Sequence, residues 1–263
     1  MGSNDLLRYA QLAHYSYHNT IDPDDLKTDT SPTMEVKRYL DESNAQCYVY
    51  QDKNELIICF RGSDSVGDAI TNVNFIPVEF YIKGQHCGRV HGGYLDYYKR
   101  LRNQLMSILK EHIKEYGSTS RLSFVGHSLG GCVVLCALEA SYVFSDIQDM
   151  SVYTFGAPSV GNKDFRDTVH KQIKSITRVV YENDIVPHLP LNLINVHIAE
   201  EPIHIKHTVQ DRFAITKCVE HHNMDNYIQA LKRHAHNNIP LPQPKSKRSS
   251  YFWSASRAPF LQF

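Results

Sequence analysis

The sequence has no excess of charge of either sign and no apolar run of membrane-spanning length. Its 28 Lys and Arg residues balance 28 Asp and Glu residues, so the formal charge at pH 7 is zero. A neutral chain has no global field to attract a polyanion, and we expect no nucleic-acid partner. No apolar run approaches the roughly 20 residues that a transmembrane helix requires. Hydrophobic residues nevertheless make up 42% of the 263 positions, enough for the large core of an α/β domain.

Targeting signals and metal-binding patterns are also missing. The first 17 residues contain no apolar segment preceded by basic residues, so they do not resemble a secretory signal. Leu6 stands where a myristoylation motif beginning at Gly2 needs Ser or Thr. The chain has no His-Glu-x-x-His pattern and no cysteine pairs at ligand spacing, so we expect neither a metal ion nor another cofactor.

Six cysteines are present, but their positions do not indicate a disulfide framework. Cys59, Cys132 and Cys136 lie in apolar runs, where cysteine behaves as a small hydrophobic residue. The other three are scattered along the chain: Cys47, Cys87 and Cys218. We therefore expect reduced thiols and an intracellular protein.

The most informative feature of the sequence is the pattern Gly-His-Ser-Leu-Gly at residues 126–130. It follows a β-favouring run, residues 122–125, and an apolar run of helical length begins at Leu129. A strand that turns sharply into a helix leaves no room for side chains two positions from the central serine, so glycine is required there. The turn exposes the Ser128 hydroxyl, and the Leu129 N–H points where an oxyanion would form. The bare pattern could be an incidental glycine-rich turn, but both flanks favour a nucleophile at Ser128.

A second strand end supplies groups that suit an oxyanion site. Two β-favouring runs, residues 47–50 and 56–60, flank a polar turn and predict a hairpin. The second run is apolar throughout, as in a buried central strand, and an Arg-Gly-Ser segment ending at Ser63 follows it. Because α/β folds keep their sites at the carboxyl ends of their strands, we expect Ser63 to provide a second oxyanion donor beside Leu129.

Residues 64–75 come next and predict a short amphipathic helix. Val66, Ile70 and Val73 would share one face of this helix, with polar residues opposite. Its position directly after the oxyanion strand suggests a lid over an apolar cleft, and an ordinary surface helix is an equally good interpretation.

An acid and a histidine follow in the order that a catalytic triad needs. Asp184 comes just past a predicted strand, residues 176–181, whereas Asp164 and Asp167 fall on a predicted helix away from strand ends. Among 15 histidines, two lie in the connection before the last predicted helix, where this kind of fold carries its base. They are His221 and His222. We assign a structural role to the histidine inside the turn, His127.

Strands and helices alternate along the chain, which predicts an α/β-hydrolase with a mostly parallel central sheet flanked by helices. Residues 4–17 predict a covering helix. Residues 194–198 and 203–207 predict a hairpin around a Glu-Glu-Pro turn. We expect one domain, residues 1–239, followed by a flexible tail, residues 240–263.

Five segments together resemble the class 3 lipases, the family of the filamentous-fungal triacylglycerol lipases. They are CFRGS, VHGGYLDYY, VGHSLGG, TFGAPSVGN and ENDIVPHLP. Their order and approximate spacing match the family over residues 47–231. The resemblance implies that Ser128 is the nucleophile, Asp184 the acid, Ser63 and Leu129 the oxyanion hole, and residues 64–75 the lid.

The resemblance also implies a base and a substrate class. Relatives carry a His-x-x-x-x-Tyr arrangement, which His222 and Tyr227 fit, whereas His221 is one residue too early. The implied substrates are lipid esters at a lipid–water interface, acylglycerols first and phospholipid acyl esters, as in a phospholipase A, second. A non-lipid carboxylesterase is possible on the same scaffold. A catalytically silent lipid-binding protein is the remaining alternative, which the intact Ser-Asp-His set disfavours.

The last 24 residues differ in composition from the rest of the chain. From Pro240 onward there is no acidic residue, but there are four basic residues and several aromatic ones. The composition favours a disordered extension. The alternative is peripheral membrane contact, in which basic groups face anionic headgroups and Phe252 and Trp253 lie at the interface.

Overall fold

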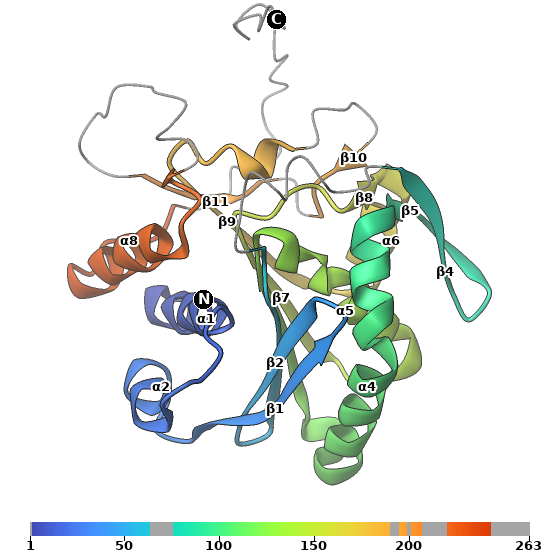
Figure 1. The fold of residues 1–263 in the computed structure, drawn as a ribbon, viewed down its shortest axis with the longest axis horizontal. Helices are drawn as coiled ribbons and strands as arrows, with labels where there is room; N and C mark the ends of the chain where they lie inside the picture. Colours follow the sequence, from blue (N-terminus) through green and yellow to red (C-terminus); the bar gives the residue numbers. More distant parts are fainter. Residues whose placement is uncertain (1, 64–75, 190–194, 199–200, 207–219, 243–263) are drawn as a thin grey trace, which may run out of the picture.

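The computed structural model describes residues 2–63, 76–189, 195–198, 201–206 and 220–242. A seven-stranded sheet with the strand order β1-β2-β3-β6-β7-β9-β11 forms its centre (Figure 1). The strands are β1 Met34–Glu42, β2 Ala45–Asp52, β3 Glu55–Phe60, β6 Arg121–His127, β7 Asp149–Phe155, β9 Ser175–Tyr181 and β11 Ile203–Ile205. Strands β1 to β3 are antiparallel, and from β3 onward all neighbours are parallel. The predicted mostly parallel sheet and the hairpin of β2 and β3 are confirmed.

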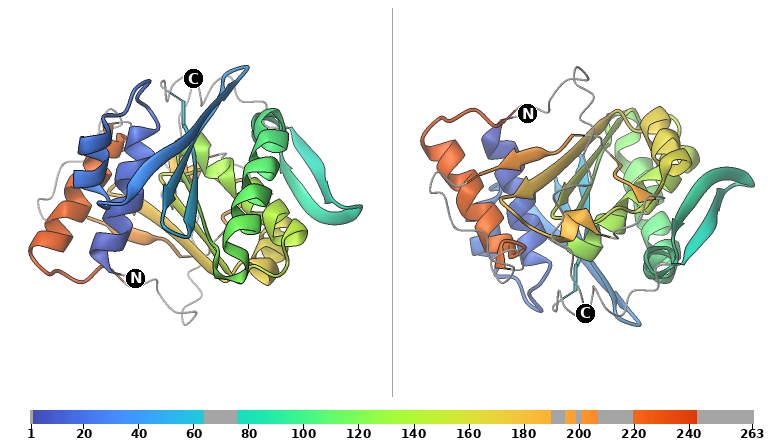
Figure 2. Two further views of the ribbon diagram at one scale, coloured as in Figure 1. Left: turned by 90° about the horizontal axis from the view of Figure 1, so that it is seen from below. Right: turned by 90° about the horizontal axis from the view of Figure 1, so that it is seen from above.

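Helices cover both faces of this sheet (Figure 2). One layer contains α1 Ser3–Tyr15, α2 Pro23–Asp29 and α8 Met224–His236, and the other contains α4 Gly92–Tyr116, α5 Val133–Val143 and α6 Lys163–Gln172. Each layer buries its own hydrophobic cluster against the sheet. The predicted N-terminal helix is confirmed as α1, which lies beside α8 in Figure 1. Two helices far apart in the sequence therefore lie side by side on one face of the sheet.

A smaller sheet has the order β10-β8-β5-β4. Its strands are β10 Asn195–Val196, β8 Gly161–Asn162, β5 Gln85–His91 and β4 Pro77–Ile82. The β4–β5 ribbon projects from the body beside α4 (Figure 1). The predicted hairpin of residues 194–198 and 203–207 is wrong, because β10 pairs with β8 and β11 pairs in parallel with β9. The parallel pairing buries Ile205 completely in the core, which a hairpin on the surface would leave in water.

Two expectations about the whole chain can be compared with the described residues. The five cysteines among them are all buried and free: Cys47, Cys59, Cys87, Cys132 and Cys136. In the part of the chain that the structure describes, no helix is long and apolar enough to cross a membrane. Cys218, the predicted lid at residues 64–75 and the tail from residue 243 lie outside the described residues.

Candidate active site

Ser128 occupies a strained turn between β6 and α5. Its φ of 57° lies in the left-handed region, which costs a non-glycine residue about 1–3 kcal/mol. A 3₁₀ turn, Ser128–Cys132, connects the strand to α5. A Cβ at Gly126 would come within 2.0 Å of the Gly130 carbonyl oxygen, and one at Gly130 within 2.2 Å of the Phe60 oxygen. The predicted need for glycine on both sides of the serine is thus confirmed by backbone contacts.

The segment after β3 runs against this turn. A Cβ at Gly62 would lie 3.1 Å from the Ser128 Cβ and 2.7 Å from the His127 carbonyl oxygen. Ser63 follows directly and is half-buried, as is Leu129 on the other side of the nucleophile position. The two predicted oxyanion donors therefore belong to backbone segments that adjoin Ser128.

Asp184 and His222 form a buried pair. The His222 Nδ1 lies 2.8 Å from Asp184 Oδ2, and the two side chains are 1% and 0% exposed. The same carboxylate oxygen accepts a hydrogen bond from the Tyr227 hydroxyl at 2.6 Å, and Asp184 Oδ1 accepts one from the Val186 N–H at 2.9 Å. The structure distinguishes the two candidate histidines, because the His221 Nδ1 faces the Asn183 N–H instead.

Gly156, at the end of β7, makes room for this pair. Its φ is +55°, and a Cβ there would lie 2.7 Å from Asp184 Oδ2, 2.9 Å from the Tyr227 hydroxyl and 3.0 Å from His222 Cε1. Any side chain at this position would collide with Asp184 and His222. The absence of a side chain at Gly156 therefore leaves the space that Asp184 and His222 occupy.

His127 holds the segment that carries His222, a contact that the sequence did not reveal. Its Nε2 lies 2.8 Å from the His222 carbonyl oxygen, and its Nδ1 lies 2.7 Å from the Tyr17 hydroxyl. The rings of His127 and His222 stack at 4.5 Å. Burial, followed by the nearby His222, lowers the pKa of His127 well below its ordinary value. A neutral His127 next to the base adds no charge to the site.

The remaining nitrogen of His222 is available for proton transfer. Its Nε2 is buried and has no hydrogen-bond partner among the residues that the structure describes. Because Nδ1 donates to Asp184, the neutral ring carries its lone pair on Nε2. Hydrogen bonds between nucleophile and base are often formed only with substrate present. The arrangement therefore supplies an oriented base adjacent to a strained, glycine-flanked serine, which suits nucleophilic catalysis on a carbonyl group.

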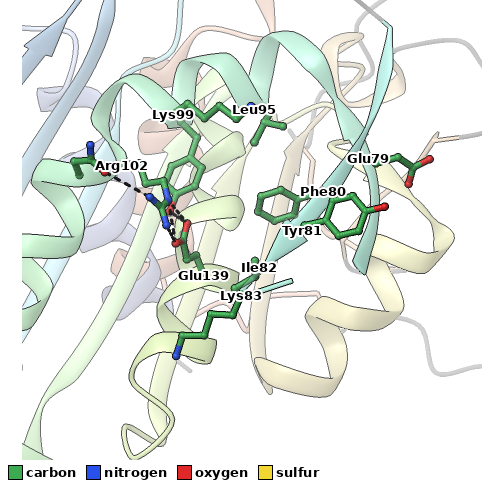
Figure 3. A pocket seen from close by; sticks show the side chains of 11 residues that line it. Glu79, Phe80, Tyr81, Ile82, Lys83, Leu95, Lys99, Arg102 and Glu139 are labelled. Atoms are coloured by element: carbon green, nitrogen blue, oxygen red, sulfur yellow. Dashed lines mark hydrogen bonds and ion pairs between the residues drawn. The ribbon is translucent and has the colours of Figure 1, made fainter. Parts of the chain in front are cut away.

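A separate cleft of about 480 Å³ lies between the β4–β5 ribbon and α4 (Figure 3). Arg102 and the buried Glu139 line this cleft and form an ion pair. Glu139 also accepts a 2.7 Å hydrogen bond from the Tyr98 hydroxyl. None of the predicted site residues lines it. Because the partners of Glu139 are already in place, the cleft offers no unpaired buried charge to a ligand.

Comparisons with known proteins identify related sequences. The model of the family described as Lipase (class 3) matches residues 57–194. A lipase of Rhizomucor miehei is 31% identical over 199 residues, 71% of this chain and 54% of the relative. The secreted mono- and diacylglycerol lipase 1 of Fusarium solani is 34% identical over 145 residues, 54% of this chain and 42% of the relative. The chain thus spans about half the length of the curated relatives it matches.

Solved structures show the same similarity in three dimensions. The Rhizomucor miehei triacylglyceride lipase has a TM-score of 0.68 and 30% identity, covering 77% of this chain and 79% of its own. A triacylglycerol lipase whose catalytic centre is described as a serine protease triad has a TM-score of 0.68 and 28% identity over 78% of this chain and 80% of its own. The α/β-hydrolase fold predicted from the sequence is confirmed by this likeness.

Proposed function

This chain belongs to the class 3 lipase family, and from that membership and the geometry around Ser128 we propose that it is a serine hydrolase that cleaves carboxylic esters of lipids. The observation that carries the proposal is the buried pair of Asp184 and His222 beside the strained Ser128 turn. A catalytically silent lipid-binding protein would have no need for a buried carboxylate, a histidine with a free Nε2 and a strained serine in one place.

In the proposed mechanism, Ser128 Oγ attacks the ester carbonyl carbon while its proton passes to His222 Nε2. Asp184 keeps the His222 ring oriented and stabilises its positive charge. The N–H groups of Ser63 and Leu129 hold the tetrahedral oxyanion. The alcohol leaves with the proton from His222, and an acyl ester remains on Ser128. Water then attacks this ester with His222 as the base, so that the fatty acid is released and Ser128 regains its proton.

The substrate class comes from the relatives, which are named as triacylglyceride, triacylglycerol and mono- and diacylglycerol lipases. We place acylglycerols first and phospholipid acyl esters, as in a phospholipase A, second. A non-lipid carboxylesterase is the next alternative, since the fold and the triad do not fix the acyl group. No cofactor is needed for any of these reactions.

The test is hydrolysis by the wild type and by Ser128→Ala of a soluble short-chain ester, emulsified triacylglycerol and phospholipid vesicles. We expect wild-type hydrolysis of the emulsion and a loss of about 10⁴-fold or more in Ser128→Ala, since the acyl-enzyme cannot form. Ser141→Ala is the matched control, because Ser141 is a buried serine of α5 whose hydroxyl donates a hydrogen bond to the Leu138 carbonyl oxygen of the same helix. Equal rates in Ser128→Ala and the wild type would refute the proposal.

Contact with a lipid surface through residues 64–75 or the tail after Pro240 stays part of the proposal. It predicts that the chain binds anionic vesicles and that removing the residues after Pro240 weakens binding. Unchanged binding after this deletion would exclude the tail as the contact.

We also propose an intracellular location, supported by the buried, free state of the five described cysteines. Two of the similar fungal enzymes are named as secreted. Fractionation of cells that express the chain from its own gene would decide between the two locations.

A further inference from the structure

Two histidines at the carboxyl end of α1 point their rings at each other. The Nε2 atoms of His14 and His18 lie 3.3 Å apart, and the ring centroids are 5.0 Å apart with an angle of 65° between the planes. His14 is half-buried and His18 is exposed. Two imidazoles bound to one tetrahedral ion, with metal–nitrogen distances of about 2.0–2.1 Å, place their nitrogens about 3.3–3.4 Å apart. The observed separation therefore fits a shared metal ion without movement of the backbone.

A carboxylate faces the other nitrogen of the more buried ring. His14 Nδ1 lies 3.4 Å from Asp225 Oδ1, at the first turn of α8. A ring nitrogen that faces a carboxylate keeps the proton, so the lone pair of the neutral His14 ring is on Nε2, the atom that faces His18. Metal-bound histidines almost always have such a carboxylate or carbonyl partner on the other nitrogen.

Charged side chains of both signs lie near His14. Asp225 and Asp29 contribute negative charge near His14, and Lys232 contributes positive charge. Asp22 and Asp25 are also close enough to act on Tyr15, whose ring packs 5.8 Å from that of His18.

We propose that His14 and His18 form a surface site for a divalent transition-metal ion, with Asp225 as the residue that orients His14. In the described part of the chain, no three His, Cys, Asp or Glu side chains are grouped to hold a metal. The ion therefore has two protein ligands and completes its coordination with water, and its affinity follows the order Cu²⁺ above Zn²⁺ and Ni²⁺. Through Asp225, which lies in the first turn of α8 and three residues after His222, the ion would link α1 to α8. This inference does not depend on the proposed hydrolase activity.

Zinc binding to the full chain, purified without a histidine tag, tests the site. Isothermal titration slightly above neutral pH should show one Zn²⁺ site in the wild type that is weakened at least about tenfold in His18→Gln. His170→Gln is the matched control, because His170 is an exposed helical histidine on α6. It should bind as the wild type does. Asp225→Asn should weaken binding by about tenfold, as other changes behind a metal-bound histidine do.

Two further readouts separate a metal site from a simple hydrogen bond between the rings. Saturating Zn²⁺ should raise the thermal midpoint of the wild type and of His170→Gln but not that of His18→Gln. Co²⁺ should give visible absorption bands that require His18. Equal zinc isotherms for the wild type and a folded His18→Gln would overturn the proposal and leave the 3.3 Å contact as a hydrogen bond.

Discussion

The carboxylate of Asp184 accepts three hydrogen bonds, one of which orients the His222 ring. His222 Nδ1 and the Tyr227 hydroxyl both donate to Oδ2, and the Val186 N–H donates to Oδ1. Burial, followed by the negative charge of Asp184, raises the pKa of Tyr227 well above its ordinary value, so the hydroxyl keeps its proton and donates. A buried carboxylate needs such donors, because burial removes the water that would otherwise solvate its charge.

Replacing Tyr227 with Phe should weaken both the fold and the reaction. The variant loses a hydrogen bond to a charged group, which contributes about 1.5–3 kcal/mol to stability. We expect kcat to fall by about tenfold, since the His222 ring is held less firmly. Urea unfolding and ester hydrolysis by the folded variant measure the two effects.

Tyr15→Phe provides the control for this prediction. It removes another tyrosine–carboxylate hydrogen bond, 2.8 Å from the Tyr15 hydroxyl to Asp29 Oδ2, on the α1–α2 side of the molecule. The control should lose some stability but keep kcat. If both variants lost activity equally, the bond between Tyr227 and Asp184 would have no special role in positioning the base.

At the scale of elements, the sequence predicted the Ser128 turn better than the contacts that support it. The need for Gly126 and Gly130 can be read from a local pattern. The atoms that exclude a side chain at these positions belong to the same turn and to the end of one neighbouring strand. The contacts of His127 with Tyr17 and with the His222 carbonyl join residues 110 and 95 positions apart. Such contacts depend on how α1 and α8 pack together, which no local periodicity reveals.

The strand pairing near the end of the chain was missed for a related reason. Residues 203–205 form only a three-residue strand, and its parallel partner β9 lies more than 20 positions earlier. A short β-favouring run next to a turn predicts a hairpin, because local pairing has the smallest loop-closure cost. Here the burial of Ile205 in the core decides the pairing instead.

The geometry of the Ser128 turn predicts a large effect of Gly126→Ala. The added methyl would meet the backbone of residues 130 and 131, which cannot rotate away as a side chain can. We expect a loss of at least about 2–3 kcal/mol in the free energy of unfolding. We also expect a loss of hydrolysis in whatever fraction folds, because the turn that carries Ser128 must shift. Denaturant unfolding and activity per folded molecule measure this.

Gly84→Ala serves as the reference for that substitution. Gly84 has a positive φ, 81°, unlike Gly126, and a Cβ there would meet nothing within 4 Å. It should cost only the strain of the left-handed backbone, about 1–2 kcal/mol, and leave the reaction unchanged. A Gly126→Ala variant no less stable than Gly84→Ala would show that the turn is not closely packed.

At the scale of the whole molecule, the two hydrophobic layers enclose histidines that are neutral in the folded state. His91 and His127 are 1% and 4% exposed. Burial lowers the pKa of His91 to about 4, and burial followed by the charge of His222 lowers that of His127 well below its ordinary value. Histidines in the unfolded chain titrate near a pKa of about 6.5. Below that pH the unfolded chain binds protons that the folded chain does not.

The free energy of unfolding should therefore decrease as the pH falls below about 6.5. Above that pH, neither histidine makes the free energy of unfolding depend on pH. Each contributes up to about 1.4 kcal/mol per pH unit, and the loss from His91 is complete near pH 4. Urea unfolding at a series of pH values measures the slope. His91→Phe keeps a ring to stack on Tyr94, which lies 4.2 Å from His91, but cannot bind a proton. The slope of the free energy of unfolding against pH should be smaller in this variant by the contribution of one histidine. An equal slope in both proteins would show that His91 is protonated as easily in the folded chain as in the unfolded one.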